Sequence, residues 1–437
     1  MYKLQVCNDC LNAMKLIFRV SRIFGVAPVS FVKSLTHAEE FVETEPSRNI
    51  VGSLSSVIVF CAMAMGLILS VADCIINDVK DAGELLHHIV SQPMLFLSAG
   101  VSIAMHFTVN RFKIAELLEQ LSSINKVVME KQRQYFIDAN QRYPRSSVMM
   151  LVIVFFSHLI FLCLDFFLQA RYYLTAIRGV TLNVADFVNF VMMIQFCNFV
   201  RCIRDTLTEL NTIISVNRDG NTVGYSAKRG FKSRQQFGQR SASRSAVHID
   251  MIQENSPFRR DINHPTPGET LSVRHIIFCR RVYNDVYDAH VLVNSIYGIP
   301  LLLGFVVNVT FSIINVYRIL MDPVTISILM ASRLKRIETL IFRVFWFFMC
   351  TAVAFYVTVS SHMVTVESNK LNDEIQKLLL LHPLHKDSVK QLKLFSDQIS
   401  KNCIKFSAFC FFTIDMSLFC VYVATTIAYT IVLVQFK

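Results

Sequence analysis

Seven long apolar stretches interrupt a chain that is otherwise polar. A helix that crosses a bilayer needs roughly 20 mostly apolar residues. Four stretches reach this length without a single Asp, Glu, Lys or Arg: 50–72, 85–110, 289–317 and 344–366. Three more carry one acid each: 146–170 with Asp165, 179–200 with Asp186, and 406–436 with Asp415. We count all seven as spans, 179–200 being the weakest, and predict an all-α integral membrane protein.

Between the spans, apolar residues recur at helical spacing in segments that are otherwise charged. The pattern is seen in 111–136, 201–216, 371–379 and 389–399. An amphipathic helix needs a surface on which to bury its apolar stripe. We therefore expect cytoplasmic helical extensions that form a bundle between subunits, and a helix lying on the lipid surface is the alternative.

The apolar stretches divide the chain into six parts. Residues 217–268 are rich in Gly, Ser, Asn, Arg and Gln and lack apolar periodicity, which predicts a disordered basic loop, either a plain linker or a site for phosphorylation or anionic lipid. The expected parts are a cytoplasmic N-terminal segment (1–48), spans one to four with cytoplasmic helices (49–216), the loop (217–268), spans five and six (269–366), a cytoplasmic helical anchor (367–405) and a pore-lining seventh span (406–437).

Composition and charge agree with a membrane location. Of the 437 residues 53% are hydrophobic and 17% charged, whereas soluble domains carry about a quarter charged residues. The 43 Lys and Arg residues fall unevenly on the two sides of the seven spans, 34 with the N-terminus and nine with the C-terminus. Because cytoplasmic loops carry the excess, we expect a multi-pass plasma-membrane protein with a cytoplasmic N-terminus and an extracellular C-terminus. A basic cluster at Arg333, Lys335 and Arg336 opposes this trend.

Other chemistry has little support in the chain. The 12 Cys residues are scattered, and Cys7-x-x-Cys10 lacks the second pair that a zinc site needs. No metallohydrolase, nucleotide-binding or nucleophile-elbow motif stands where it would matter, and no basic and aromatic surface points to nucleic acid. We expect no enzyme activity, no cofactor, no metal and no nucleic-acid partner.

Seven spans are typical of G-protein-coupled receptors, but the predicted orientation is the reverse of theirs and their motifs after span three and in span seven are missing. The chain ends instead on Tyr429, five residues Thr-Ile-Val-Leu-Val, and Gln435-Phe436. This ending, together with Phe406–Asp415, resembles the signature of the insect gustatory receptors, which are related to the insect odorant receptors. Two positions depart from the pattern, because Ala428 stands where the family usually has Thr and Cys410 stands where Gly is common.

The resemblance implies a homotetrameric, ligand-gated, nonselective cation channel with no need of a G protein. It implies that span seven of each subunit lines a central pore and that each subunit holds one ligand pocket, open to the outside among spans two to six. The expected partners are a small-molecule tastant, monovalent and divalent cations, membrane lipid and other copies of the chain.

The residues of the last span suit a pore. At about 100° per residue, two neighbouring stripes run along the helix, and a small rotation would exchange the stripe that faces the axis. Gln435 and Phe436 are the expected constriction, with an apolar ring that gates by dewetting and amide dipoles for a passing cation; ordinary helix packing is the alternative. The two stripes comprise Thr425, Tyr429, Val432 and Phe436, and Ala428, Ile431 and Gln435.

Polar residues inside spans are candidates for ligand binding because they are costly in lipid. Trp346, the only Trp, lies three residues after Arg343, so the two share a helix face. An indole beside charged groups suits a sugar, although Arg343 pairing with Asp165 or Asp186, and Trp346 at the membrane interface, are alternatives. The candidate ligand residues are Trp346, Arg343, Asp165, Gln169, Asp186, Asn189, Asn308, Asn315, Tyr317 and His88.

Three functions follow from this pattern. The first is a gustatory receptor channel opened by a small polar tastant, with a sugar slightly favoured over a bitter compound. The second is an odorant-receptor-like subunit that needs a co-receptor, which the Gln435-Phe436 ending disfavours. The third is a membrane transporter or scaffold.

Overall fold

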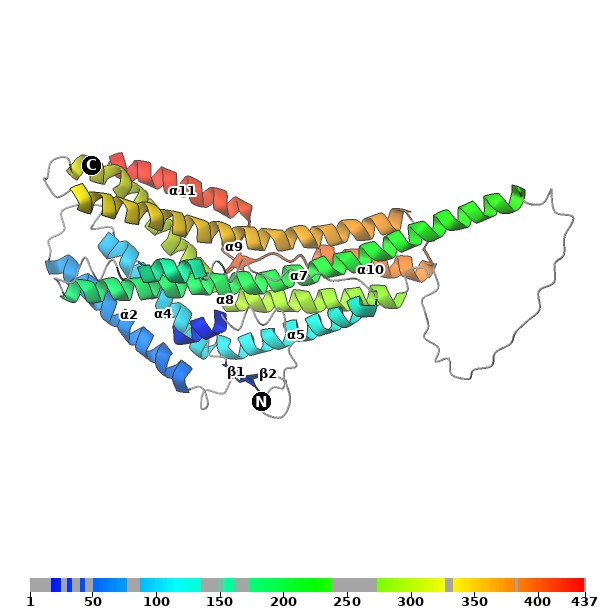
Figure 1. Ribbon diagram of the computed structural model, residues 1–437, viewed down its shortest axis with the longest axis horizontal. Helices are drawn as coiled ribbons and strands as arrows, with labels where there is room; N and C mark the ends of the chain where they lie inside the picture. Colours follow the sequence, from blue (N-terminus) through cyan, green and yellow to red (C-terminus); the bar gives the residue numbers. More distant parts are fainter. Residues whose placement is uncertain are drawn as a thin grey trace, which may run out of the picture. The chain divides into compact units, whose positions relative to one another are not determined.

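The structure is a computed structural model, and it describes residues 17–24, 30–33, 40–43, 50–76, 87–134, 149, 152–160, 163, 173–237, 273–326, 333–381 and 384–435. Nearly all of the described chain is helical (Figure 1). The elements in chain order are β1 (Ser30–Lys33), β2 (Glu40–Glu43), α2 (Ile50–Ile76), η1 (His87–Ser91), α4 (Gln92–Thr108), α5 (Asn110–Gln134), α7 (Tyr173–Phe237), α8 (Val273–Ile326), α9 (Arg333–Leu381), α10 (Lys386–Lys401), β3 (Ser407–Ala408), β4 (Phe412–Thr413) and α11 (Met416–Gln435).

Six helices of the described chain are long and apolar enough to cross a membrane: α2, α4, α7, α8, α9 and α11. They coincide with six of the seven predicted spans. Of the remaining stretch, 146–170, residues 152–160 form a helix and most of the rest lies outside the described residues. The predicted class, an all-α membrane protein, is confirmed, and the only sheets among the described residues are the two-stranded β1–β2 and β3–β4.

The chain divides into two compact units, and the first contains residues 1–207, 282–368 and 403–437. Its core is the middle of α7, where every residue from 185 to 200 is buried. A helix that is covered on all sides can carry polar residues if each finds a partner inside the protein. Gln195, for example, donates to the Ser21 hydroxyl over 2.5 Å and accepts from the Tyr297 hydroxyl over 3.3 Å.

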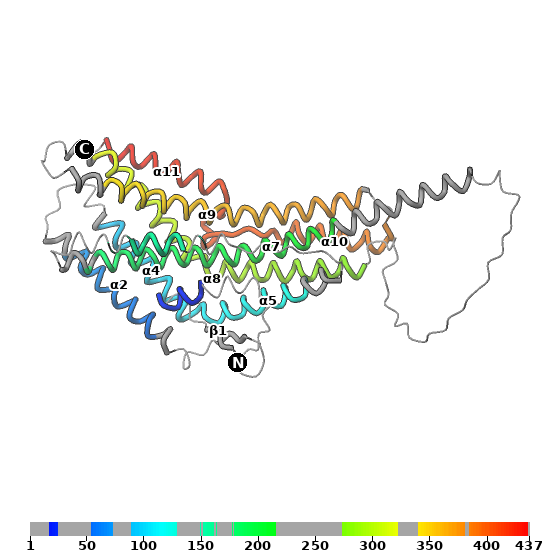
Figure 2. The backbone as a smooth tube through the Cα atoms, viewed as in Figure 1, coloured from blue at the N-terminus to red at the C-terminus, as the bar shows by residue number. Residues whose placement is uncertain are grey.

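Two helices of the first unit approach each other closely because of a glycine. α2 packs along α4 (Figure 2). At Gly66 of α2, an added Cβ would lie 2.5 Å from the Thr181 hydroxyl of α7 and 2.7 Å from the Phe96 ring of α4. Small residues at such points are how membrane helices come into contact.

The second unit contains residues 208–281 and 369–402. It confirms the amphipathic pattern, because Leu392, Phe395 and Ile399 of α10 are all buried. Arg280 of α8 donates to the side-chain oxygens of Gln391 over 2.5 Å and Gln398 over 3.3 Å. The predicted amphipathic stretches at 111–136, 201–216, 371–379 and 389–399 are helical wherever they are described.

Two predicted boundaries differ from the structure. The seventh span was expected from residue 406, but the helix begins at Met416, and residues 407–413 form a hairpin instead. The loop was expected from residue 217, but α7 continues to Phe237. Residues 238–268 lie outside the described residues, so the loop stays a prediction there.

Candidate ligand site and pore helix

The candidate ligand residues of the first unit are mostly buried. Arg343 is half-buried, whereas Asp186, Asn189, Asn308, Asn315, Tyr317 and Trp346 are each less than a tenth exposed. His88 belongs to η1, with its side chain undescribed, and Asp165 and Gln169 lie outside the described residues.

An aromatic cluster surrounds the single Trp. The Trp346 ring of α9 lies 5.2 Å from that of His158, 6.2 Å from that of Phe190 and 6.0 Å from that of Phe342, with which it is stacked at 3°. Phe187 closes the group at 5.3 Å from His158. We call these five residues the aromatic cluster. Sequence reasoning found only Trp346, because isolated Phe and His residues in apolar spans carry no local signal of a shared site.

His158 brings an unused polar atom into the aromatic cluster. Its Nδ1 donates to the Val154 carbonyl over 2.8 Å, one turn earlier in the same helix. In the neutral ring the other nitrogen, Nε2, is then an acceptor. Nε2 is buried and has no hydrogen-bond partner among the described residues. It is therefore available to a hydroxyl or amine of a ligand.

Two of the candidate amides also retain unused donors. Asn189 accepts from the Ser98 hydroxyl over 2.8 Å, while its Nδ2 is buried and unpartnered within the described chain. The Nδ2 of Asn315 has the same status. Asn308 donates to the Met193 sulfur over 3.6 Å. Unpaired buried donors are rare because each costs about 1–3 kcal/mol, so these amides suit the polar groups of a ligand.

Asp186 is the acid of this region. No hydrogen bond or ion pair joins it to any residue that the structure describes, and the pairing with Arg343 considered from the sequence is not found. Asp186 directly precedes Phe187 and lies one turn before Phe190 on α7, so two members of the aromatic cluster are its neighbours along the helix.

The pore-helix candidate, α11, packs on its own subunit along one stripe. Tyr422, Thr426 and Thr430 are its buried residues, and each Thr hydroxyl donates to the carbonyl four residues earlier, over 2.9 and 2.7 Å. The predicted pore residues lie elsewhere on the helix. Thr425 is half-buried and Ala428, Tyr429, Ile431, Val432 and Gln435 are exposed in the single chain, while Phe436 lies outside the described residues.

Contacts from two other helices hold α11 in place. The Tyr422 hydroxyl is hydrogen-bonded to the Ser312 hydroxyl of α8 over 2.5 Å. α11 also lies along α9 (Figure 1), where the Phe419 ring is 5.1 Å from the Phe355 ring. The same two helices carry the candidate ligand residues Asn308, Asn315 and Trp346. α8 and α9 therefore connect these candidate residues to α11.

The start of α11 is fixed by a capping carboxylate. Asp415 accepts from the backbone N–H groups of Ser417 and Leu418 over 3.0 and 3.2 Å, and from the Ser417 hydroxyl over 2.5 Å. These bonds stabilise the charged form of the carboxyl group and hold the pKa of Asp415 below its usual value. The bond from the Ser417 hydroxyl has the largest effect, and the backbone N–H groups add to it. The acid at this position is a helix N-cap.

The hairpin before α11 is bound to α8. Its two central residues, Phe409 and Cys410, have positive φ angles of 48° and 61°, as a type I′ turn requires. Asn294 of α8 accepts from the Ser407 N–H over 3.1 Å, and His290 is hydrogen-bonded to the Lys405 carbonyl over 2.8 Å. The hairpin thus sets the position from which α11 begins.

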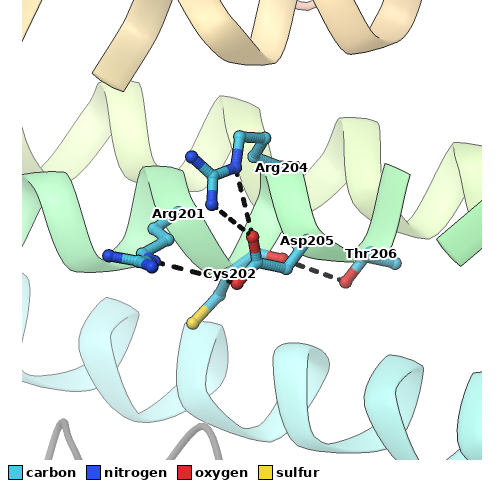
Figure 3. A network of polar contacts seen from close by, with 5 residues as sticks. All are labelled: Arg201, Cys202, Arg204, Asp205 and Thr206. Atoms are coloured by element: carbon cyan, nitrogen blue, oxygen red, sulfur yellow. Dashed lines mark hydrogen bonds and ion pairs between the residues drawn. The ribbon is translucent and has the colours of Figure 1, made fainter. Parts of the chain in front are cut away.

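A charged network follows the apolar part of α7 (Figure 3). Arg204 donates to the Asp205 carboxylate over 2.7 Å, and Arg201 lies 3.9 Å from the same group. All three residues come after the predicted end of the fourth span at residue 200. They are partly exposed, so the network is a surface feature and contributes little to a ligand site. The described residues contain no group of His, Cys, Asp or Glu that could hold a metal ion, and Cys7 and Cys10 lie outside them.

Comparison with known proteins finds a family model that matches the sequence and solved structures with a similar fold. The family model described as "7tm Chemosensory receptor" matches residues 14–437. No curated protein matches the chain. The structures of the insect olfactory receptor OR5 from Machilis hrabei, without ligand and in complex with eugenol, are each 12% identical to this chain, cover 98% of it over 100% of their own length, and have a TM-score of 0.59. At this identity the likeness shows the fold alone.

Proposed function

Since the family match spans nearly its whole length, this chain belongs to the 7tm chemosensory receptor family, and we propose that it is a gustatory receptor that acts as a tastant-gated, nonselective cation channel. In this proposal it is a homotetramer in the plasma membrane, with a cytoplasmic N-terminus and an extracellular C-terminus. A small ligand binds on the extracellular side of each subunit and opens a pore lined by α11.

The surface of α11 is the observation that supports the pore. At about 100° per residue, the stripe of Ala428, Ile431 and Gln435 lies roughly opposite the buried stripe that contains Thr426. It therefore points directly away from the body of the subunit, and Thr425, Tyr429 and Val432 flank it. In a ring of subunits, a stripe that points in this direction can face the central axis.

The buried polar atoms beside Trp346 support the ligand site. His158 Nε2 and the Nδ2 atoms of Asn189 and Asn315 are unpartnered in the described chain. A few placed polar groups among aromatic side chains are typical of small-molecule sites. A sugar carries a hydroxyl group on almost every carbon, and three unpartnered polar atoms among five aromatic rings are few for such a ligand. The arrangement therefore favours a ligand with an apolar body and a small number of polar groups over a sugar.

The test is to express the chain alone in cells and to record membrane current while tastants are applied with G-protein signalling blocked. The expected result is a ligand-dependent cation current. Absence of current for every ligand, despite expression at the cell surface, would contradict the proposal.

An odorant-receptor-like subunit is the second candidate, and the fold similarity to the olfactory receptor OR5 favours it. That candidate predicts current only when another receptor subunit is co-expressed. Current from the chain alone therefore separates the two functions.

A further inference from the structure

We propose that the ligand of this site is an organic cation, a protonated amine on an apolar or aromatic body, and that Asp186 is its counter-ion. The inference rests on the proposed function, because it names the ligand class of the same site. Its starting point is an acid inside a span that has no partner in the described structure.

Asp186 stands where an ionised carboxylate is costly. The residue is 8% exposed, and it lies in the apolar stretch 179–200 of α7. A buried charge normally has a partner, because its transfer out of water otherwise costs several kcal/mol. No described hydrogen bond or ion pair involves this side chain. Without a partner such a carboxyl is expected to stay protonated. A cation that enters from outside the chain would displace the proton to solvent and pair with the carboxylate.

No Lys or Arg of the described chain is paired with Asp186. The apolar stretches 179–200 of α7, 289–317 of α8 and 344–366 of α9 contain no Lys and no Arg. Arg343 comes just before the α9 stretch, and no ion pair joins it to Asp186 in the described chain. A positive group on the ligand would supply the missing charge.

Helix geometry brings the carboxylate to the aromatic cluster. Asp186 directly precedes Phe187 and lies one turn before Phe190 on α7. Both Phe residues belong to the aromatic cluster, and the Phe190 ring lies 6.2 Å from the Trp346 ring. Asp186 is therefore one helical turn, about 5–6 Å, from the level of the indole.

A carboxylate next to aromatic rings is a recognised means of binding ammonium groups. Ring faces attract a cation, Trp most strongly, and the attraction grows when water is excluded. The aromatic cluster provides Trp346, Phe187 and Phe190, and Asp186 provides the full negative charge. His158 Nε2 and the Asn189 amide remain for other polar groups of the ligand.

The experiment measures binding to the purified full-length protein by thermal shift, so it does not depend on channel opening. The probes are N,N-dimethylbenzylamine, which is protonated at neutral pH, and isobutylbenzene, its neutral isostere. We expect the amine to bind at least about 30-fold more tightly than the isostere, since losing one partner of a buried charge pair costs 2–5 kcal/mol. Equal affinity for the two probes would overturn the proposal.

Three variants make the test specific. Asp186→Asn keeps the shape of the side chain and should abolish the preference for the amine, whereas Asp186→Glu keeps the charge and should retain part of it. Asp288→Asn removes an acid that is exposed on α8 and should leave the preference unchanged. A preference that survives in Asp186→Asn also overturns the inference.

The two proposals can fail separately. Amine binding that depends on Asp186 but never produces current would contradict the channel function and leave the ligand class standing. Currents evoked equally by amines and their neutral isosteres would contradict the ligand class and leave the channel function standing.

Discussion

The hydroxyl groups of Tyr422 and Ser312 form a buried hydrogen bond of 2.5 Å that joins α11 to α8. Both residues lie inside apolar stretches, where few competing partners exist. The bond therefore connects the helix that we propose as pore lining to a helix that carries two candidate ligand residues, Asn308 and Asn315.

Removal of this bond should destabilise the packing of α11. We expect Tyr422→Phe and Ser312→Ala each to lower the free energy of unfolding by about 1–2 kcal/mol, because each breaks a hydrogen bond between two buried hydroxyl groups. The double variant should cost clearly less than the sum of the two, since neither hydroxyl then remains. Thermal unfolding of the four proteins in detergent measures this coupling, and strictly additive losses would contradict it.

Asp415 should stabilise the start of α11 at neutral pH. We expect Asp415→Ala to lower the free energy of unfolding by about 1 kcal/mol, the usual effect of losing an N-cap, and Asp415→Asn to retain most of the stability. Thermal unfolding at pH 7 measures both. If Asp415→Asn lost as much stability as Asp415→Ala, the hydrogen bonds of the cap would not be the source of the stabilisation.

The same cap predicts a pH dependence. The pKa of the Asp415 carboxyl is lower in the folded protein than in the unfolded chain, first because of the Ser417 hydroxyl. The contribution of the carboxylate to the free energy of unfolding is therefore complete above the pKa that Asp415 has in the unfolded chain, about 3.9. It is lost as the pH falls through the lower pKa of the folded protein. The difference in unfolding temperature between wild type and Asp415→Ala should shrink below about pH 4. A difference that stays constant down to pH 2 would contradict this assignment.

Cys410 should be a point of backbone strain. Its φ of 61° lies in the left-handed region. Gly adopts this conformation without strain, whereas other residues are destabilised there by about 1 kcal/mol or more. We expect Cys410→Gly to stabilise the protein by up to about 1 kcal/mol, the net of relieved strain and greater freedom in the unfolded chain. Cys410→Ala is the matched control, because it removes the thiol and keeps the strain. If Cys410→Ala gained as much stability as Cys410→Gly, the effect would come from removal of the thiol and not from relief of backbone strain.

This turn also explains one limit of reading the chain from its sequence. The run from Phe406 to Phe412 is apolar, and a short apolar run has the same composition in a hairpin as in a membrane helix. The positive φ angles at Phe409 and Cys410 decide between the two, and Cys has no preference that signals such a turn. The Gly that is common in the resembled family at the position of Cys410 is the residue that would have signalled it.

The fourth span shows the opposite case. Asp186 is the one acid in 179–200, the weakest of the predicted spans, yet this part of α7 is the most completely buried of the six spans in the described chain. A helix covered by protein on all sides does not face lipid, so a polar side chain on it can be paired inside the protein, as the Asn189 side-chain oxygen is with the Ser98 hydroxyl. Hydropathy measures compatibility with lipid, and it underrates a helix of this kind.

The candidate site was predicted in part. Asp186, Asn189 and Asn315 could be selected from the sequence as polar residues inside spans, because their cost in lipid is local, and the structure shows that all three are buried. The aromatic cluster could not be selected in this way, because His158, Phe190 and Trp346 are far apart in the chain and meet only through tertiary packing. The roles of all these residues in ligand binding remain predictions.

Gln435 is the residue on which the pore proposal can be tested most directly. It is exposed at the end of α11, on the stripe that points away from the subunit body. If amide dipoles at this position meet the permeating ion, Gln435→Ala should lower single-channel conductance, alter relative permeability to cations or change the basal leak, without loss of surface expression. Thr430→Val is the matched control, since Thr430 is buried on the opposite stripe of the same helix. Unchanged conductance, permeability and leak in Gln435→Ala, or an equal change in Thr430→Val, would remove Gln435 from the pore. A change confined to Gln435→Ala would place its stripe on the central axis, because a side chain that faced lipid or the subunit body would not contact the ions.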